Sequence, residues 1–430
     1  MIDYLVVGYG VVGRGVVAHL KGRVVIIDQQ PIAVERNNAR EVQVVLGAVT
    51  EHNFVELLAR FSAPGTIVIE TANHVGTADV VAWCHANGRH FVNTVADIWH
   101  SELVEWSDGY RNIDGLLYRV VEPLFALHER ASAGPTSVVM QGANTGMVNH
   151  YLRQAIRDLA NASGTSEDEV GRAVRQVYIL EKDTLTFRPG VRPEPDVFYN
   201  TWNIKEFILE SAALCEFPEN GTRTVRDRPL QRDVFLDDVV VKGRLVPHEE
   251  TFTMAYCLER AYANRQASIQ FLYEASPIGV FSRMRYPFGY DYVERCVTHE
   301  VDTGYDLVGT LIVLQDGRNW FTGYRMENAV ARRFFTDSNA TAWYVSAGVL
   351  AAVDWIRAQP ERGILFPEFA DNAAVIDRFL NWGERSHYIS RPVSSLFVSS
   401  EYDDISIANL FATGERVYRE AADTVLAAAG

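Results

Sequence analysis

The sequence is poor in cysteine and has no long uninterrupted apolar run. Its four cysteines, Cys84, Cys215, Cys257 and Cys296, are far apart and form no C-x-x-C motif or metal-binding spacing. We therefore expect reduced structural thiols and no metal site. No apolar stretch approaches the roughly 20 residues that a membrane helix needs, and nothing before the first predicted strand is typical of a signal peptide. These absences predict a cytoplasmic protein.

Basic residues are also scarce relative to acidic ones. The 430 residues include 40 Lys and Arg against 55 Asp and Glu, which gives a formal net charge of −15. This surplus of acids argues against nucleic-acid binding, and it favours either a cationic ligand or simple solubility. The length and the 48% hydrophobic content predict two or three domains with well-filled cores.

The most informative motif lies near the amino terminus. The apolar run Leu5–Val7 predicts a buried parallel strand, and Gly8, Gly10 and Gly13 follow it as G-x-G-x-x-G. These glycines permit a tight turn, close approach to a pyrophosphate and close packing of the next helix, whose amides face the phosphate. Asp28 ends the next apolar run, 20 residues after Gly8. A carboxylate there would accept both ribose hydroxyls and repel a 2′-phosphate, so the pattern predicts NAD rather than NADP.

The first 145 residues alternate apolar runs with helical stretches. Strand-like runs lie at 3–8, 23–28, 42–49, 66–71, 90–95 and 136–141. This rhythm predicts an α/β fold with a Rossmann-type, doubly wound parallel sheet, in which ligands bind beyond the carboxyl ends of the strands. The residues that we expect to contact the cofactor there are Gly8, Gly10, Val11, Val12, Gly13, Asp28, Thr50, Thr71, Asn73, Thr94, Ala143 and Asn144.

Longer β-rich runs then predict a second, α+β domain with a mostly antiparallel sheet. The expected runs are Gln176–Leu180, Val234–Leu245, Thr251–Leu258, Ser268–Glu274 and Tyr292–Val313, with turn residues at 301–309 and a helix near 203–214. From residue 339 apolar positions recur at helix spacing. The predicted division is 1–146 for an NAD-binding domain, 147–338 for a substrate and dimerisation domain, and 339–430 for a segment that packs back on the first domain.

Several polar residues follow predicted strands, and the residues alone leave their roles open. Asn144 suits a bond to the nicotinamide or to a substrate amine, although its spacing favours a helix cap. Glu181 closes a strand, where it could hold a cation or shuttle a proton, although a solvated turn is commoner. Trp202, Glu206 and Glu210 are spaced to share one side of a helix. An alkylammonium over the indole would gain about 0.5–2 kcal/mol, but a core tryptophan is the ordinary alternative.

Three further residues have ordinary explanations when each is taken alone. Thr201 is placed to cap the helix that follows it. His248 follows the apolar run 239–246, and a lone histidine is usually structural. Asp306 lies between Tyr305 and Leu307, where a turn is expected. The sequence contains no nucleophile elbow, P-loop or metal-ligand pattern.

Taken together, longer motifs resemble bacterial homospermidine synthases, which belong with the saccharopine-dehydrogenase-like proteins. The motifs are GYGVVGRG at 8–15, AVTEHNF at 48–54, NTVADIW at 93–99, GANTGMV at 142–148, LEKDT at 180–184, FYNTWNIKEF at 198–207, LVPHEE at 245–250 and SNATAWYVSAGVL at 338–350. They span nearly the whole chain, and the NTW and GAN-G-MV segments are the specific ones. The chain departs from the family at Thr145, where the family has proline, and at Asp97, where Glu is expected.

The resemblance implies an enzyme that transfers an aminobutyl group. Such an enzyme oxidises putrescine or spermidine to an imine with NAD and releases ammonia. It then joins the product to a second putrescine and reduces the new imine, so that NAD is recycled. The implied partners are putrescine and related polyamines, together with a second copy of the chain in a homodimer. Neither a nucleic acid nor a membrane is implied.

The resemblance also implies roles for individual residues. Trp202 would hold ammonium groups by cation–π attraction. Glu181 and Glu210 would position amine nitrogens. The other implied site residues are His248, near the nicotinamide, and Asn144 and Asp306, in the pocket.

Two alternatives differ from a synthase in features that the sequence can test. A saccharopine or carboxynorspermidine-type dehydrogenase would use NADPH or NADH as a co-substrate. It would want arginine near the pocket and, with NADPH, no acid at position 28. A catalytically inactive NAD-sensing protein would keep the glycines and Asp28 but lose the acidic pocket. Trp202 with Glu181 and Glu210 favours the synthase.

Overall fold

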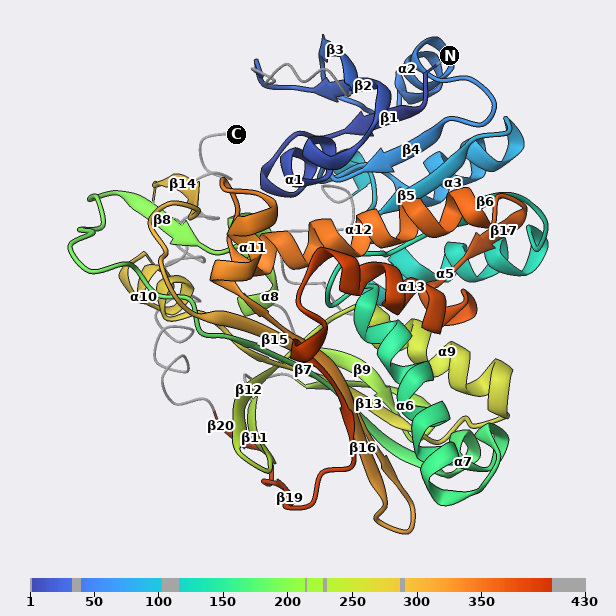
Figure 1. The fold of residues 1–430 in the computed structure, drawn as a ribbon, viewed down its shortest axis with the longest axis vertical. Coiled ribbons are helices and arrows are strands. Elements are labelled where there is room, and N and C mark those ends of the chain that lie inside the picture. The colour runs from blue at the N-terminus through green and yellow to red at the C-terminus, as the bar shows by residue number, and fades with distance from the viewer. Residues whose placement is uncertain are drawn as a thin grey trace, which may run out of the picture.

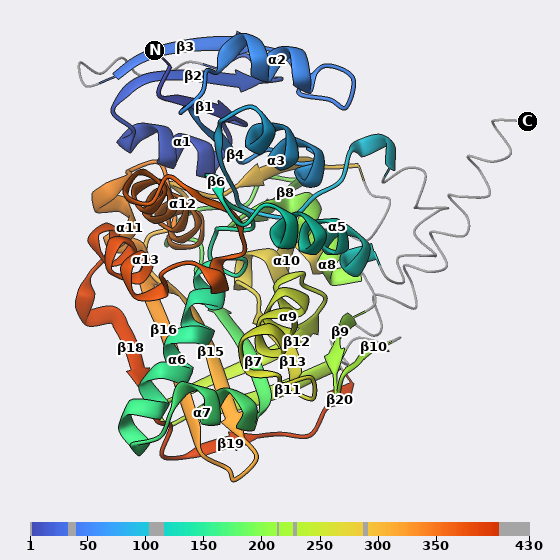
Figure 2. The same ribbon diagram turned by 90° about the vertical axis from the view of Figure 1, so that its right-hand side faces the viewer.

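The computed structural model describes residues 2–32, 40–102, 116–212, 215–226, 230–286 and 291–403. Two large β-sheets dominate it, one near the amino terminus and one formed mainly by the middle of the chain (Figures 1 and 2). Helices cover both sheets and fill the space between them. Among the described residues, no helix is both long and apolar enough to cross a membrane.

The first sheet has seven strands in the order β17-β6-β5-β4-β1-β2-β3, and every neighbouring pair is parallel. The strands are β1 (Tyr4–Val7), β2 (Gly22–Asp28), β3 (Arg40–Leu46), β4 (Ile67–Glu70), β5 (His90–Asn93), β6 (Gly134–Val138) and β17 (Arg362–Leu365). The helices between them are α1 (Val11–His19), α2 (Phe54–Phe61), α3 (Thr77–Ala86) and α5 (Leu116–Arg130). This arrangement confirms the predicted doubly wound sheet, and β17 adds a seventh strand to the six expected.

The apolar runs became central strands because both faces of this sheet are covered. All four residues of β1 and of β4 are buried. A strand that is covered on both sides needs an unbroken apolar run rather than an alternating one. The prediction therefore succeeded best where the run was continuous.

The second sheet has nine strands, and it confirms the predicted mostly antiparallel arrangement. Its order is β18-β16-β15-β7-β13-β12-β11-β19, with β20 paired to β11, and β7 and β13 form its parallel pair. The strands are β7 (Val174–Asp183), β11 (Leu230–Leu236), β12 (Val239–Val246), β13 (Ser268–Glu274), β15 (Tyr305–Leu314), β16 (Asn319–Glu327), β18 (Tyr388–Arg391), β19 (Leu396–Val398) and β20 (Tyr402–Asp403). Two small pairs join β8 (Val197–Asn200) to β14 (Val293–Cys296) and β9 (Cys215–Glu219) to β10 (Thr222–Arg226).

The remaining α-helices of the described residues follow β6 in the chain. They are α6 (Met147–Ser163), α7 (Glu167–Ala173), α8 (Ile204–Ala212), α9 (Glu250–Tyr262), α10 (Pro277–Arg285), α11 (Asn328–Phe334), α12 (Ala340–Ala358) and α13 (Asn372–Phe379). The prediction of a strand over 251–258 is wrong, because α9 covers these residues. Phe252, Met254, Tyr256 and Leu258 alternate in the sequence as strand residues do. The helix packs against α6, α7 and β13, so most of its sides are buried and the helical period is hidden.

Two other predicted strands are divided. The run 234–245 forms a hairpin of β11 and β12, which turns at Asp237 with φ +57°. The run 292–313 separates into β14 and β15. Asp306, predicted in a turn, is the second residue of β15 and is fully buried. Its neighbours in the sequence are typical of a turn, but pairing on both sides with β7 and β16 keeps the strand extended.

Helix α12 lies between the two sheets (Figure 1) and contacts β5 and β6 of the first and β15 and β16 of the second. It also packs on α1, where the Ser346 hydroxyl donates to the Val12 carbonyl at 3.2 Å. The part of the chain after α12 contributes β17 to the first sheet and β18, β19 and β20 to the second. The division at residues 146 and 338 stays a prediction.

Candidate active site

The glycine motif forms a tight turn between β1 and α1. Gly8 has φ +90°, and a Cβ there would lie 2.8 Å from the Ala72 nitrogen. A Cβ at Gly13 would lie 2.4 Å from the Gly8 carbonyl oxygen, so α1 packs directly on the turn. A Cβ at Gly10 would meet no heavy atom within 4 Å. The turn therefore leaves open space at the start of α1, where Val11 and Val12 present their backbone amides.

Asp28 lies beside this turn at the end of β2. Its Oδ2 accepts the Tyr9 backbone N–H at 2.6 Å, and its Oδ1 accepts the Gln30 N–H at 2.7 Å. These two bonds fix the carboxylate against the glycine turn. A carboxylate has about four acceptor positions, so both oxygens can still receive ribose hydroxyls.

The other predicted cofactor residues line the same edge of the first sheet. Thr71 and Asn73 follow β4, and the Thr71 hydroxyl donates to the Gly8 carbonyl at 3.0 Å. Thr94 follows β5, and its carbonyl accepts the Thr145 hydroxyl. Thr50 follows β3 and precedes α2, and Ala143 lies after β6, between β6 and α6. Their contacts with a dinucleotide stay predictions.

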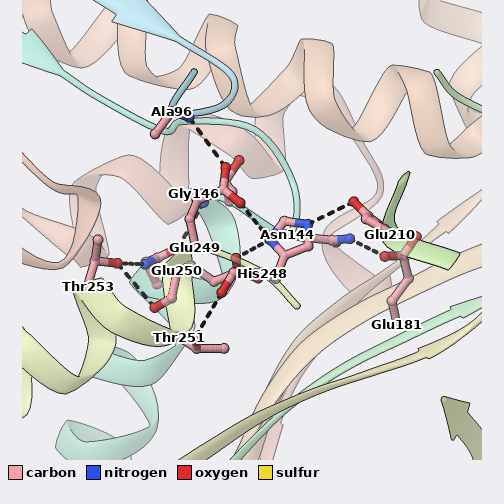
Figure 3. A network of polar contacts seen from close by, with 12 residues as sticks. Ala96, Asn144, Gly146, Glu181, Glu210, His248, Glu249, Glu250, Thr251 and Thr253 are labelled. Atoms are coloured by element: carbon pink, nitrogen blue, oxygen red, sulfur yellow. Dashed lines mark hydrogen bonds and ion pairs between the residues drawn. The ribbon is translucent and has the colours of Figure 1, made fainter. Parts of the chain in front are cut away.

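Asn144 joins this edge to the second sheet. Its side-chain amide donates a hydrogen bond to Glu181 of β7 (Figure 3). The interpretation of Asn144 as a helix cap is wrong, because α6 begins after Gly146, whose N–H is accepted by the Asn149 side chain at 2.8 Å. Thr145, at the family's proline position, ties the turn to β5 through its hydroxyl.

Glu181 belongs to a group of three buried carboxylates on one face of the second sheet. Glu181 and Asp183 are two residues apart on β7, so they point to the same face. Asp306 of β15 pairs directly with Asp183, which places it on that face as well. All three are at most 3% exposed, so the interpretation of Glu181 as a solvated turn residue is wrong.

Burial changes the protonation of these acids. It raises the pKa of Glu181 to about 8, against the lowering effect of the Asn144 hydrogen bond, and it raises the pKa of Asp183 to about 6. The pKa of Asp306 is raised well above its usual value by burial and by the charges of Glu181 and Asp183. Asp183 accepts the hydroxyls of Thr201 and Thr341 at 2.6 and 3.2 Å. The Thr341 hydroxyl donates to Asp183. In the described part of the chain, neither carboxylate oxygen of Asp306 has a hydrogen-bond partner.

His248 lies among three more carboxylates, between β12 and α9 (Figure 3). Its Nε2 is 3.5 Å from Glu210 Oε1, its Nδ1 is 3.5 Å from Glu249 Oε2, and Nδ1 also contacts Glu250. Burial lowers the pKa of His248, but Glu250 and Glu249 raise it more, and the net pKa is well above 6.5. The surrounding acids therefore favour the charged form of His248, and this environment differs from that of a lone structural histidine.

Burial also raises the pKa values of Glu210 and Glu250, which favours their protonated forms. The pKa of Glu210 is raised well above its usual value by burial, although the charge of His248 lowers it. The pKa of Glu250 is raised to about 7 in the same way. Glu249 accepts the Ala96 backbone N–H at 3.3 Å, which connects the cluster to the segment after β5.

A second acidic group, which the sequence analysis did not identify as a unit, lies next to this cluster. Glu206 is one turn before Glu210 on α8, and burial together with the charge of Asp97 raises its pKa to about 7. The Asp97 carboxylate accepts the His74 backbone N–H, and Asp97 raises the pKa of the His74 side chain. The sequence did contain an indication of this group. His74 and Asp97 come shortly after β4 and β5, at the sheet edge where ligands bind in such folds.

Trp202 lies between β8 and α8 and is half-buried. Its indole N–H donates to the Tyr273 hydroxyl at 2.9 Å, and its ring meets that of Phe207 edge-on at 6.0 Å. The prediction that Thr201 caps α8 is wrong, because its hydroxyl donates to Asp183, and Asn203 accepts the Lys205 N–H at 3.0 Å. Asp183 and Tyr273 were not predicted as site residues. The sequence Glu181-Lys182-Asp183 in β7 could have indicated Asp183, because alternate residues of a strand share one face.

The site brings several buried acids together. In the described part of the chain, no lysine or arginine forms an ion pair with any of the six carboxylates around Glu181 and His248, which are Glu181, Asp183, Glu210, Glu249, Glu250 and Asp306. The ligand atoms of His248, Glu249 and Glu250 lie within 4.8 Å of one another, a spacing that a metal ion could use. A metal ion binds neutral imidazole, so it would have to displace the proton that the neighbouring acids favour on His248. The cluster suits an organic cation that can share these acids.

Known proteins resemble this chain in sequence and in fold. Residues 4–138 match the family model described as the saccharopine dehydrogenase NADP binding domain. The homospermidine synthase of Mesorhizobium japonicum is 24% identical over 429 residues, covering 87% of each chain, and that of Blastochloris viridis is 26% identical over 416 residues, covering 84% of this chain and 85% of the relative.

The chain resembles homospermidine synthases along most of its length. This confirms the resemblance predicted from its motifs. A solved homospermidine synthase from Legionella pneumophila, described as a complex with NAD, has the same fold with a TM-score of 0.76 and 18% identity, covering 93% of this chain and 91% of that chain.

Proposed function

We propose that this protein is a homospermidine synthase that binds NAD and transfers an aminobutyl group from putrescine, or from spermidine, to putrescine. Two putrescine molecules would give one homospermidine and one ammonia, with no net change in oxidation state. The single observation that carries the proposal is the bond from Asn144 to Glu181. It joins the carboxyl edge of the nucleotide-binding sheet to a cluster of buried acids that form no ion pair with lysine or arginine among the described residues.

The pocket's acids support selection of a diamine. Putrescine carries two positive charges near pH 7, because its amines have pKa values near that of lysine, about 10.4. A buried cation needs carboxylates to offset its lost hydration. Glu181, Asp306 and Glu210 supply them from β7, β15 and α8, and Trp202 adds an indole that attracts alkylammonium groups.

The same acids support the proton transfers. An ammonium must lose a proton before its carbon can yield a hydride or its nitrogen can attack an imine. Glu181, with a pKa of about 8, and Glu250, with a pKa of about 7, can exchange protons near neutral pH. His248 would return a proton to the departing ammonia. Its Nε2 lies 3.5 Å from Glu210, the acid that would hold the amine nitrogen.

The residues around the glycine turn fit a nicotinamide dinucleotide. The open space at Gly10 accommodates a pyrophosphate at the start of α1, and Asp28 is fixed where ribose hydroxyls are expected. The cofactor would accept the hydride from the diamine and return it to the new imine. Asn144 follows β6 and donates its side-chain amide to Glu181. Through this bond it would orient the Glu181 carboxylate toward the substrate nitrogen. The homodimer and the cytoplasmic location stay predictions.

Incubation of the purified protein with putrescine and NAD tests the proposal. We expect homospermidine and ammonia in equal amounts, measured by mass spectrometry and an ammonia assay, with no net rise in NADH absorbance. Accumulation of NADH in proportion to product would favour an ordinary dehydrogenase. Retention of NAD with no product from any diamine would favour the sensing protein.

The affinity for putrescine should rise with pH between about 6 and 8. Glu250 and Glu206 (pKa about 7) and Glu181 (pKa about 8) bind protons at the lower end and become anionic at the upper end. Putrescine stays dicationic over this range, so each added negative charge strengthens its attraction. We expect KM to fall as pH rises, and calorimetry in buffers of different ionisation enthalpy should detect proton release on binding. A KM that rises with pH would contradict this assignment.

A further inference from the structure

The Trp202 ring is oriented by one hydrogen bond, together with edge-on contacts to the rings of Phe207 and Tyr273. Its indole N–H donates to the Tyr273 hydroxyl at 2.9 Å, and Tyr273 lies on β13 with 5% of its surface exposed. The indole N–H lies in the plane of the ring, so this bond directs the edge of the ring at Tyr273. It thereby sets the direction in which the faces of the ring point.

The backbone of Trp202 is held independently of its ring. The Thr201 hydroxyl donates to Asp183 at 2.6 Å, and the Thr201 carbonyl accepts the Asn339 side-chain amide at 2.6 Å. Asn339 also caps α12 by accepting the Ala342 N–H at 2.8 Å. Loss of the Tyr273 hydroxyl would therefore remove the hydrogen bond that directs the ring edge and leave the backbone of Trp202 in place.

Tyr273 also borders the acidic face of the second sheet. It pairs in register with Glu181 on the neighbouring strand, so the two side chains project side by side. Burial and the charges of Glu181 and Asp183 raise the pKa of Tyr273 well above 10, which keeps the phenol protonated. Since the hydroxyl oxygen already accepts the indole N–H, its own proton is directed away from the indole.

We propose that Tyr273 is a positioning residue that presents a face of Trp202 to the substrate ammonium beside Glu181. This inference rests on the proposed function. Cation–π attraction depends on the cation lying over the ring face, and a ring free to rotate spends part of its time edge-on to the cation. Tyr273 thus acts on substrate binding through Trp202 and does not itself need to contact the reacting atoms.

A double-mutant cycle with Tyr273→Phe and Trp202→Phe tests this inference. In the wild-type background, Tyr273→Phe should raise KM for putrescine about 3- to 10-fold, the size of a weakened cation–π contact, with kcat changed less than about twofold. NAD retention should be unchanged. In the Trp202→Phe background, which has no indole N–H, adding Tyr273→Phe should change KM no further.

Tyr178→Phe is the matched control. Tyr178 is 6% exposed and lies on the opposite face of the same sheet. There its hydroxyl accepts a hydrogen bond from the Arg232 guanidinium at 3.1 Å. Its loss should leave KM and kcat unchanged. An unchanged KM in Tyr273→Phe, an equal rise in both backgrounds or an equal rise in Tyr178→Phe would overturn the inference. Failure of the wild-type protein to make homospermidine would overturn the proposed function itself, and the inference with it.

Discussion

Replacing Glu181 with glutamine is expected to lower the turnover of putrescine by about 10²- to 10⁴-fold, the usual contribution of a positioned general base. Glutamine keeps the size of the side chain and an oxygen that can accept the Asn144 amide. It cannot take a proton from an ammonium group at neutral pH. Glu181 is 3% exposed, so water cannot easily replace it.

The measurement is kcat for homospermidine formation, together with NAD affinity from calorimetry. NAD affinity should stay close to that of the wild type, since Glu181 lies on β7 of the second sheet. Glu274→Gln is the matched control, because Glu274 lies on the adjacent strand, on the opposite face, and pairs with Lys182 at 2.8 Å. The control should keep its turnover. Full turnover in Glu181→Gln would remove Glu181 from the proposed chemistry.

Replacing Gly10 with valine is expected to lower NAD affinity by more than about 10²-fold and to abolish synthesis without unfolding the protein. Gly10 has φ −70° and ψ −164°, an extended conformation that valine adopts readily. Its added Cβ would meet no heavy atom within 4 Å. The isopropyl group would instead fill the space that a pyrophosphate needs at the start of α1.

Gly13→Ala provides the contrast within the same motif. A Cβ at Gly13 would lie 2.4 Å from the Gly8 carbonyl oxygen, so this variant should lower the melting temperature of the cofactor-free protein. Gly10→Val should leave that temperature near the wild-type value and lose only the stabilisation that NAD adds. A Gly10→Val protein that retains NAD would show that the cofactor does not lie on this turn.

The sequence was most informative where the physics is local. The run Leu5–Val7, the glycines after it and Asp28 lie within one strand-turn-helix-strand unit, and their contacts are made inside that unit. Residue spacing therefore predicted the first sheet and the geometry of the glycine turn. The carboxyl ends of β4, β5 and β6 were also found, since parallel strands bring their ends to one edge.

The sequence was least informative where burial by distant segments decides the outcome. Residues 251–258 alternate like a strand, yet they fold as α9 because α6, α7 and β13 enclose them. Glu181 and Asp306 look like turn residues, yet pairing between β7 and β15 places both on one buried face of the second sheet. Asn144 was expected to cap α6, but its amide donates to Glu181, a residue 37 positions away.

By itself, the sequence determined the α/β class, the parallel nucleotide-binding sheet and the resemblance to homospermidine synthases, because these depend on local periodicity and contiguous motifs. Only the tertiary structure decided that Glu181, Asp183 and Asp306 share one buried face and that Tyr273 holds Trp202. The reason is that strand register and burial arise from pairing between β7, β13 and β15. These strands are separated by dozens of residues, and a local pattern carries no record of which of them will be neighbours.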